Sequence, residues 1–247
     1  MPDNNITSIA EMVKKLNDTI DPRRGPAWCR GHADSTWQLQ PAYDRLKKPL
    51  KETELFNKFR QNANLLVDHS PSAPFDFGWM FLMQHYGVPT RLLDWTESPL
   101  VALYFAVEDR IPKNEKKDGA LWVLFPLELN RHSTKTQVYI PSFEDEWLAN
   151  YSVAQYSKEK DNGILPLAAI ATRNNPRIQA QLGVFTISHL KKSPIEKVEG
   201  GKHCIKFTIP AVAKARLKRE LRILGVTRFQ IFPELTSIGE NLREQLK

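Results

Sequence analysis

The spacing of apolar residues predicts helices in the first half of the chain. In Ser8–Asn17 the apolar positions fall on one face, and the segment opens with the S-x-x-E spacing of a capping box. A longer helix is expected over Glu52–Val67, with its apolar residues, including Leu65 and Leu66, turned toward the interior. Both helices are therefore expected to lie against a core.

Two further helices are marked by their ends. Phe77–Tyr86 is expected to be helical and to stop at Gly87, a residue that can adopt the left-handed C-terminal cap. Ser98 has the side chain of a helix N-cap, and Pro99 at the first helical position loses no useful N–H. The helix that they open, PLVALYFAVED, is apolar almost all round, so it should be buried.

Strand patterns dominate the second half of the chain. In the first half, Trp28–Gly31 is a short apolar strand candidate, and Leu92 and Leu93 can anchor another. The remaining strand candidates, most with alternating β-branched and aromatic residues, are Ala120–Pro126, Gln137–Ile140, Gly183–Ser188, His203–Ile209 and Arg228–Phe232. An amphipathic basic helix, Ala211–Leu224, should end at Gly225. The predicted fold class is therefore α+β, with a helical N-terminal half packed on a mixed or antiparallel sheet.

Length and composition are those of one globular domain. The chain has 247 residues, of which 41% are hydrophobic and 26% charged, and we expect a single domain over residues 1–247. Its two cysteines, Cys29 and Cys204, form no CxxC pair, which excludes a disulfide framework and zinc-ribbon sites. No signal pattern opens the chain, and no apolar run approaches about 18 residues. We expect a protein of the reducing cytoplasm that does not enter a membrane.

The net charge of +7 suits contact with phosphates or an acidic partner, although the excess is spread along the chain. The basic helix Lys214–Arg222 lacks interleaved aromatic residues, so its pattern favours a solvated face over a nucleic-acid interface. The acidic run Glu144–Glu146 has no neighbours at metal-ligand spacing and is expected to be a solvated turn, so we expect no metal. The GxxxxGK[ST], GxGxxG, HExxH and GxSxG motifs are absent, which excludes common nucleotide cradles, zincin proteases and α/β-hydrolases.

Candidate chemistry is concentrated in Gln84–Ser98, which reads QHYGVPTRLLDWTES. Gly87 and Pro89 redirect the chain there, and Trp95 is expected in the core. The polar residues that these structural roles leave over are His85, Thr90, Arg91, Asp94, Thr96 and Glu97.

Several short motifs together resemble the FRG domain, named for its Phe-Arg-Gly signature. The string WCRG at Trp28–Gly31 matches that signature, and QHYGVPTRLLDWT, which begins at Gln84, continues into SPLVALYFA. The later strings QLGVF at Gln181–Phe185 and FPEL at Phe232–Leu235 look like closing elements of the same family, so the resemblance spans roughly residues 20–246. FRG domains occur in bacterial and phage-related proteins, often in defence or toxin settings.

The motif order also resembles the ADP-ribosyltransferase fold. There an Arg ends an early core strand, a strand with Ser or Thr leads into a buried helix, and a Glu or Gln stands before a later strand. Here those places are taken by Arg30, by Thr96 with Ser98, and by Gln181. The resemblance implies an ADP-ribosyltransferase-like core with NAD as substrate. Arg30 would hold a phosphate or ribose, and the two hydroxyls would position the nicotinamide ribose.

The resemblance implies two sets of site residues. The catalytic set is Arg30, His85, Asp94 and Gln181, and the NAD-binding set is Arg30, Gly31, Thr90, Arg91, Thr96 and Ser98. Gly31 would let the ligand approach the backbone, and His85 would transfer a proton or hold the adenosine ribose. Gln181 can bind a ribose hydroxyl but supplies no negative charge, so Asp94 or Glu97 would have to stabilise the developing oxocarbenium-like centre.

Each assignment has a structural alternative. Arg30 can form a buried ion pair with Asp94, and His85 can cap the carbonyls at the end of its helix. Ser98 can act as an N-cap alone, and Gln181 at a strand start can simply meet water.

The implied function is that of an NAD-dependent ADP-ribosyltransferase-like effector in a toxin or phage-defence setting. Its partners would be a macromolecular acceptor, protein or nucleic acid, and an antitoxin or regulatory partner. Two alternatives stay open. One is a non-catalytic nucleotide- or nucleic-acid-binding sensor, favoured by Gln181 in place of Glu. The other is a hydrolytic, nuclease-like toxin that uses His85 and Asp94.

Overall fold

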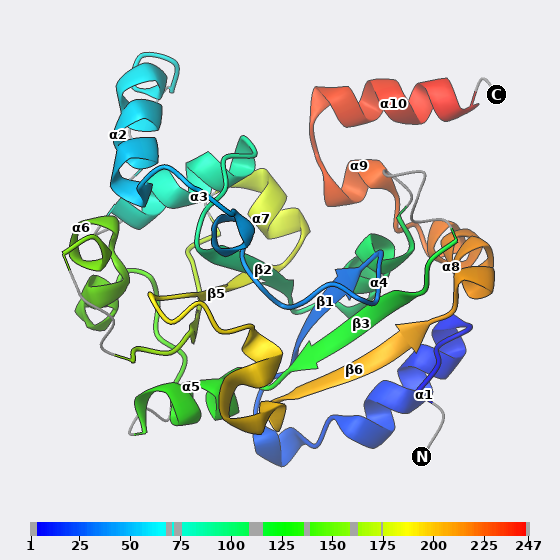
Figure 1. Ribbon diagram of the computed structural model, residues 1–247. Helices are drawn as coiled ribbons and strands as arrows, with labels where there is room; N and C mark the ends of the chain where they lie inside the picture. Colours follow the sequence, from blue (N-terminus) through cyan, green and yellow to red (C-terminus); the bar gives the residue numbers. More distant parts are fainter. Residues whose placement is uncertain are drawn as a thin grey trace.

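A six-stranded sheet forms the centre of the computed structural model, which describes residues 4–67, 71, 76–108, 116–135, 139–158, 163–173 and 175–245 (Figure 1). In order across the sheet, the strands are β4 (Leu167–Ala169), β5 (Gly183–Ile187), β2 (Leu92–Thr96), β1 (Trp28–His32), β3 (Gly119–Leu124) and β6 (Cys204–Ile209). All neighbouring strands run antiparallel. The α+β prediction is confirmed, with the sheet of the antiparallel kind.

Helices cover one face of the sheet in two separate blocks. The block over β1, β3 and β6 consists of α1 (Ile9–Thr19), α4 (Pro99–Val107) and α8 (Ala211–Ile223). The block over β2, β5 and β4 consists of α2 (Glu52–Ala63), α3 (Phe77–His85) and the 3-10 segment Glu146–Tyr151. Side chains alternate along each strand, so Cys29 and Leu121 face the first block while Leu92 and Phe185 face the second.

The opposite face carries a core rich in tryptophan. Trp28, Trp95 and Trp122 are buried there together with Leu129 of α5 (Pro126–Thr134) and residues of the 3-10 segment Ile195–Gly201. The indole N–H of Trp95 donates to the Thr186 hydroxyl at 3.1 Å, which satisfies its polar edge. Trp95 is therefore a core residue, as expected from the sequence.

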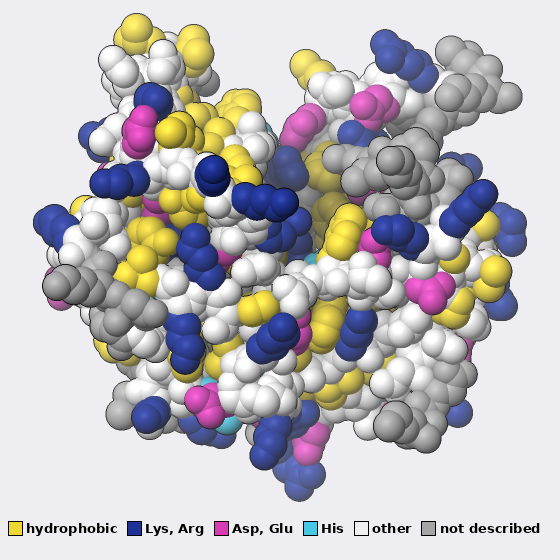
Figure 2. Space-filling view, in the orientation of Figure 1, with side chains coloured by type: hydrophobic (Ala, Val, Ile, Leu, Met, Phe, Trp, Pro, Cys, Tyr) yellow, Lys and Arg dark blue, Asp and Glu magenta, His cyan; other side chains and the backbone are white. Residues whose placement is uncertain are grey.

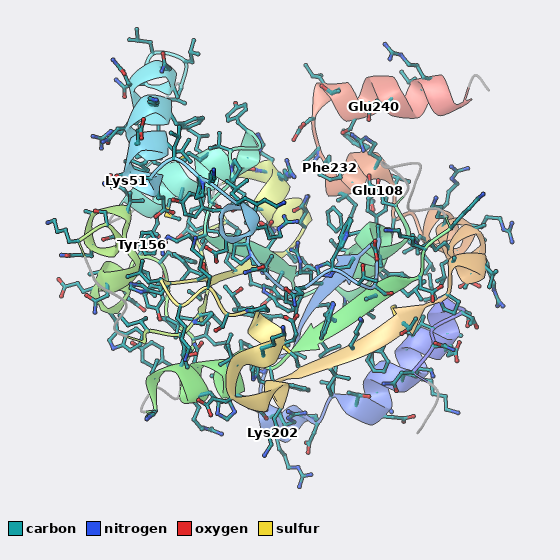
Figure 3. All side chains as sticks on the ribbon, in the orientation of Figure 1. Lys51, Glu108, Tyr156, Lys202, Phe232 and Glu240 are labelled. Atoms are coloured by element: carbon teal, nitrogen blue, oxygen red, sulfur yellow. The ribbon has the colours of Figure 1, made fainter. Side chains whose placement is uncertain are left out.

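Shorter elements complete the chain. They are the 3-10 turns Pro22–Arg24 and Tyr43–Arg45, and helices α6 (Val153–Tyr156), α7 (Pro176–Ala180), α9 (Arg228–Ile231) and α10 (Leu235–Gln245). Figure 3 labels Phe232 and Glu240 on the C-terminal segment and Glu108 nearby, and Arg228 forms ion pairs with both glutamates. Among the described residues, no helix is long and apolar enough to cross a membrane.

The helix ends follow the predicted signals. Ser8 caps α1 by accepting from the Glu11 N–H at 3.2 Å, although the Glu11 carboxylate accepts from the Thr7 N–H in place of the Ser8 N–H. Gly87 has φ +78°, and the Val88 N–H donates to the Met83 carbonyl at 2.9 Å, so α3 ends in a Schellman turn. These turns fix where the polar segment after α3 begins.

Two predicted elements differ from the structure. The second helix ends at Ala63, and Leu65 and Leu66 are 92% and 85% exposed, because the chain leaves the helix before they could turn inward. Arg228–Phe232 forms helix α9, since its apolar side chains pack against α4 and not against a strand. Part of the predicted strand Gln137–Ile140 lies outside the described residues, and its last two residues are not in a strand.

Candidate functional site

The two central strands β1 and β2 separate soon after they meet. Strand β2 pairs with β5 from Leu92 to Thr96, whereas within the described chain β1 and β2 are paired at one position, Cys29 with Thr96. From there toward His32 on β1 and toward Leu92 on β2, the two strands are not paired with each other. We call this opening the β1–β2 split, and the polar residues around it form the candidate site.

The guanidinium of Arg30 bridges the β1–β2 split. Its Nη1 donates to the main-chain carbonyl of Asp94 on β2, and its Nε donates to Nε2 of His32, 3.0 Å away on its own strand. Arg30 and His32 are two positions apart on β1, so both side chains leave the same face of the strand. The contact with Asp94 runs to its carbonyl, so the predicted alternative of a direct Arg30–Asp94 ion pair does not describe this geometry.

His32 is an uncharged partner of this arginine. The side chain is 4% exposed, and burial, with the nearby charge of Arg30, lowers the pKa of His32 to about 3. Its Nδ1 is buried and makes no hydrogen bond of ordinary geometry to a described residue, although the Trp37 main chain is close enough to raise the pKa of His32. Because Nε2 accepts from Arg30, the single ring proton lies on Nδ1.

Positive charge gathers on this side of the sheet. Burial lowers the pKa of Arg30, the charge of Asp94 raises it, and Arg45 lowers it further; Arg45 and Lys206 also lower the pKa of His32. Lys206 is held in place by the Ser35 carbonyl, to which its Nζ donates at 2.5 Å. Three cations around one opening favour an anionic ligand, and the planar fork of an arginine suits phosphate oxygens in particular.

The side chain of Asp94 leaves the other face of the sheet, the face that the helices cover. It is exposed, and its Oδ1 accepts from Gln84 Nε2 at 2.7 Å. The side-chain oxygen Oε1 of Gln84 in turn accepts from the hydroxyl of Thr90, which is 2% exposed. Gln84 therefore fixes the direction of the Asp94 side chain. Thr90 serves this network from a buried position.

Three of the predicted site residues lie together at the end of β2. The Thr96 hydroxyl donates to the Gln181 carbonyl at 2.6 Å and accepts from the Ser98 N–H at 2.9 Å. The Gln181 side-chain amide donates to the carbonyl of Ile231 in α9 at 3.1 Å. Ser98 also caps α4, accepting from the Val101 N–H at 3.4 Å. Gln181 is thus tied to the C-terminal segment instead of meeting water.

His85 is the last residue of α3, on the helical side of the sheet. Burial lowers the pKa of His85, the charge of Arg177 on α7 lowers it further, and Glu234 opposes both. The ring packs edge-on against Tyr86 with centroids 4.9 Å apart.

Figure 2 shows a hollow between the α2–α3 side and the α9–α10 side, with Lys and Arg side chains at its base.

The predicted site residues are thus divided between the two faces of the sheet. The side chains of Thr96 and Asp94 leave the helical face of the sheet, because alternate residues of β2 point to the same face. Helix α7 lies on that face, next to Gly183, the partner of Thr96. Arg30, paired with Trp122, leaves on the tryptophan-rich face. The two groups meet at the β1–β2 split, where the guanidinium reaches the Asp94 carbonyl.

Two residues of the predicted NAD-binding set, Arg91 and Gly31, are enclosed by contacts within the chain. Arg91 is fully buried and donates to Glu52 and to two main-chain carbonyls, so it has no side open to a ligand. At Gly31, a Cβ atom would lie 1.8 Å from the Ala102 carbonyl oxygen. The close approach that this glycine permits is therefore that of α4. For both residues, this geometry argues against the predicted ligand role.

Sequence reasoning did not single out two residues of the site, His32 and Gln84. The signal for His32 was its position two residues after Arg30, which places both side chains on one face of a strand. Gln84 gave no such signal, because its partners are set by how α3 meets β2. Among the described residues, no group of three or more His, Cys, Asp or Glu side chains could hold a metal ion.

Comparison with known proteins gives one match. Residues 25–115 match the family model of the FRG domain, a stretch that begins before β1 and continues past α4. No curated protein and no solved structure matches this chain significantly. The matched stretch includes the WCRG and QHYGVPTRLLDWT strings and therefore β1, β2 and the split between them. The predicted resemblance to the FRG domain is therefore confirmed over residues 25–115.

Proposed function

We propose that this FRG-domain protein is an NAD-dependent, ADP-ribosyltransferase-like effector that modifies a macromolecule in the cytoplasm, in a toxin or phage-defence setting. The observation that carries the proposal is that three motif positions, far apart in the sequence, lie on or beside adjacent strands of the sheet. Arg30 lies on β1, Thr96 on β2 and Gln181 just before β5, and these strands are neighbours in the sheet. Thr96 pairs with Cys29 on one side and with Gly183 on the other.

The surroundings of these residues support a division of tasks. Arg30, with the cations Arg45 and Lys206 near it, would bind the pyrophosphate. The hydroxyls of Thr96 and Ser98 lie at the start of α4, where they would orient the nicotinamide ribose. Departure of nicotinamide leaves positive charge on the ribose, and a carboxylate nearby stabilises that charge. The exposed side chain of Asp94 is held by Gln84, and its negative charge raises the pKa of Arg30. Asp94 would therefore be the carboxylate that stabilises the ribose.

One observation favours a second candidate function, that of a non-catalytic nucleotide sensor. Gln181 is an amide, and its side chain donates to Ile231 in the C-terminal segment. A residue in this position would transmit ligand binding at the split to α9 and α10 without any group transfer. The two functions share the ligand and differ in whether nicotinamide is released.

Both candidates can be tested with purified protein and NAD labelled in its adenylate part. Wild-type protein, Arg30→Ala and Gln181→Glu are each incubated with labelled NAD and cell lysate, and free nicotinamide and macromolecule-bound label are measured. Arg23→Ala is the matched control, because the Arg23 side chain is 90% exposed and pairs with Asp21 at the 3-10 turn Pro22–Arg24. Arg30→Ala should lose NAD binding, and the control should retain it.

The outcomes separate the two functions. Nicotinamide release with label on protein or nucleic acid supports transfer, and an increase in Gln181→Glu identifies position 181 as the limiting group. If wild-type protein and Gln181→Glu both bind NAD but release no nicotinamide, the result supports the sensor. If wild-type protein neither binds nor consumes NAD, both functions are wrong.

A further inference from the structure

We propose that His32 is a positioning residue for Arg30, whose neutral imidazole holds the guanidinium so that its remaining N–H groups face a phosphate-bearing ligand at the β1–β2 split. The choice of a pyrophosphate-containing nucleotide as that ligand rests on the proposed function. The positioning of Arg30 by His32 does not, because it follows from contacts within the chain.

The hydrogen bonds of Arg30 show what remains for a ligand. Nε is used by His32 at 3.0 Å, and one N–H of Nη1 is used by the Asp94 carbonyl. No described residue accepts from the Nη2 group in the structure, and the side chain is partly exposed. An arginine fixed at Nε and at one Nη1 hydrogen presents its three remaining N–H donors in one fixed plane, which suits the oxygens of a phosphate.

An imidazole can hold this arginine because it is kept neutral. A protonated His32 could accept no hydrogen bond and would repel the guanidinium. The charged groups that act on His32 are Arg30 on its own strand, Arg45 from the turn before α2 and Lys206 on β6, and all three are cations. Burial acts in the same direction. The three cations that would attract a phosphate therefore also keep His32 uncharged, so that its Nε2 can accept the hydrogen bond from Arg30.

The position of the imidazole is itself fixed. The ring is buried, and it packs edge-on against Trp37 with centroids 5.9 Å apart. Keeping it there leaves Nδ1 without a regular hydrogen bond among described groups, a state that is unfavourable for a buried polar atom. A purely structural site would favour an apolar residue at this position. The hydrogen bond that the His32 ring accepts from Arg30 explains why a polar residue stands here.

Two substitutions distinguish positioning from packing. His32→Gln keeps an acceptor oxygen near the place of Nε2, whereas His32→Leu keeps bulk and removes the acceptor. His203→Leu is the matched control, because His203 is also buried with a lowered pKa, but its Nε2 contacts the Ile195 carbonyl away from the split. Thermal unfolding of each variant shows that it is folded before binding is measured.

The first measurement is the dissociation constant for ADP, and separately for NAD, by titration calorimetry at pH 7.5. His32→Leu should weaken binding of both by about tenfold, the equivalent of one hydrogen bond, while His32→Gln stays within about threefold of wild type. The control should bind like wild type. Equal affinity in His32→Leu and wild type would overturn the inference, as would equal losses in His32→Leu and His32→Gln.

The second measurement needs no ligand. In proton–nitrogen NMR spectra, the Arg30 Nε–H of the wild-type protein should exchange slowly with water, and it should do so in His32→Gln but not in His32→Leu. Rapid exchange in all three proteins would refute the inference. If wild-type protein binds neither NAD nor ADP, the proposed function fails, and the Nε–H exchange still decides whether His32 positions Arg30.

Discussion

Two arginines lie on either side of strand β2, and the chain surrounds them in opposite ways. Arg91, just before the strand, is fully buried, and its Nε donates to the Glu52 carboxylate at 2.8 Å. Its two Nη groups donate to the carbonyls of Ser188 and Tyr151. Arg30, across the β1–β2 split, is partly exposed and has a neutral histidine and one carbonyl as partners.

The difference lies in how the charge is compensated. Arg91 has a carboxylate of its own, and burial raises the pKa of Glu52 while the arginine lowers it, so the pair is balanced within the chain. Around Arg30 the charge of Asp94 raises the pKa of the guanidinium without a direct ion pair, because Gln84 holds the carboxylate on the other face, and the neighbouring Arg45 opposes that effect. Both arginines belong to family-like motifs. What separates a structural arginine from a ligand-binding one is whether the fold pairs it directly with a carboxylate.

The largest effect is expected at the compensated arginine. Arg91→Leu should lower the free energy of unfolding by about 3–5 kcal/mol, because it leaves Glu52 as an unpaired buried acid. Urea denaturation measures this loss, and the double variant Arg91→Leu with Glu52→Leu should recover much of it. The exposed pair of Lys58 and Glu54 provides the control, since Lys58→Ala should cost no more than about 0.5 kcal/mol. A loss below about 1 kcal/mol in Arg91→Leu would show that the buried pair is not a structural anchor.

The next effect tests the packing beside the split. Gly31→Ala should cost about 3 kcal/mol, because the added methyl group would overlap the Ala102 carbonyl and push α4 away from β1. Gly239→Ala is the matched control. Gly239 lies in α10 with open space around it, so the same substitution there should stabilise the protein by about 0.5–1 kcal/mol. If Gly31→Ala unfolds at the same urea concentration as wild type, the space beside Gly31 is open to a ligand after all.

Local signals predicted the helices well because their ends are decided by neighbouring residues. The caps at Ser8, Gly87 and Ser98 all lie where the sequence placed them. Strand β4, Leu167–Ala169, escaped prediction because it is three residues long and has no β-branched residue. Arg228–Phe232 has the alternation of a strand but forms a helix, since its apolar residues are buried against α4. That choice depends on tertiary contacts.

The candidate site shows the same limit. The sequence predicted that Arg30, Thr96 and Gln181 form one site. They lie on or beside the neighbouring strands β1, β2 and β5, but the Arg30 side chain leaves the opposite face of the sheet from Thr96. It could not show that Arg91 is enclosed by groups up to 97 residues away in the sequence, or that the space beside Gly31 belongs to Ala102. Residue type and spacing identify where polar chemistry is concentrated. Which of those groups are already satisfied depends on contacts between distant segments.

A pH dependence sharpens the contrast at the split. The pKa of His32 is lowered from 6.5 to about 3 in the folded protein. Below pH 6.5 the unfolded chain therefore binds a proton that the folded chain refuses, and stability falls as the pH falls. At pH 5.5 this contribution should be roughly 1.4 kcal/mol relative to pH 8. Urea unfolding at both pH values should show the loss in wild type and a smaller loss in His32→Gln. Parallel pH curves for the two proteins would mean that His32 titrates normally.

The smallest effect on stability is expected at Arg30, and it completes the comparison. Arg30→Ala should cost about 1 kcal/mol in urea unfolding, because it removes the hydrogen bonds to His32 and to the Asp94 carbonyl at a partly exposed position. A loss as large as that expected for Arg91→Leu would mean that both arginines are structural. The split would then hold the sheet together and have no binding role. A small loss of stability together with a complete loss of NAD binding would establish that Arg30 serves the ligand, since the fold does not depend on it.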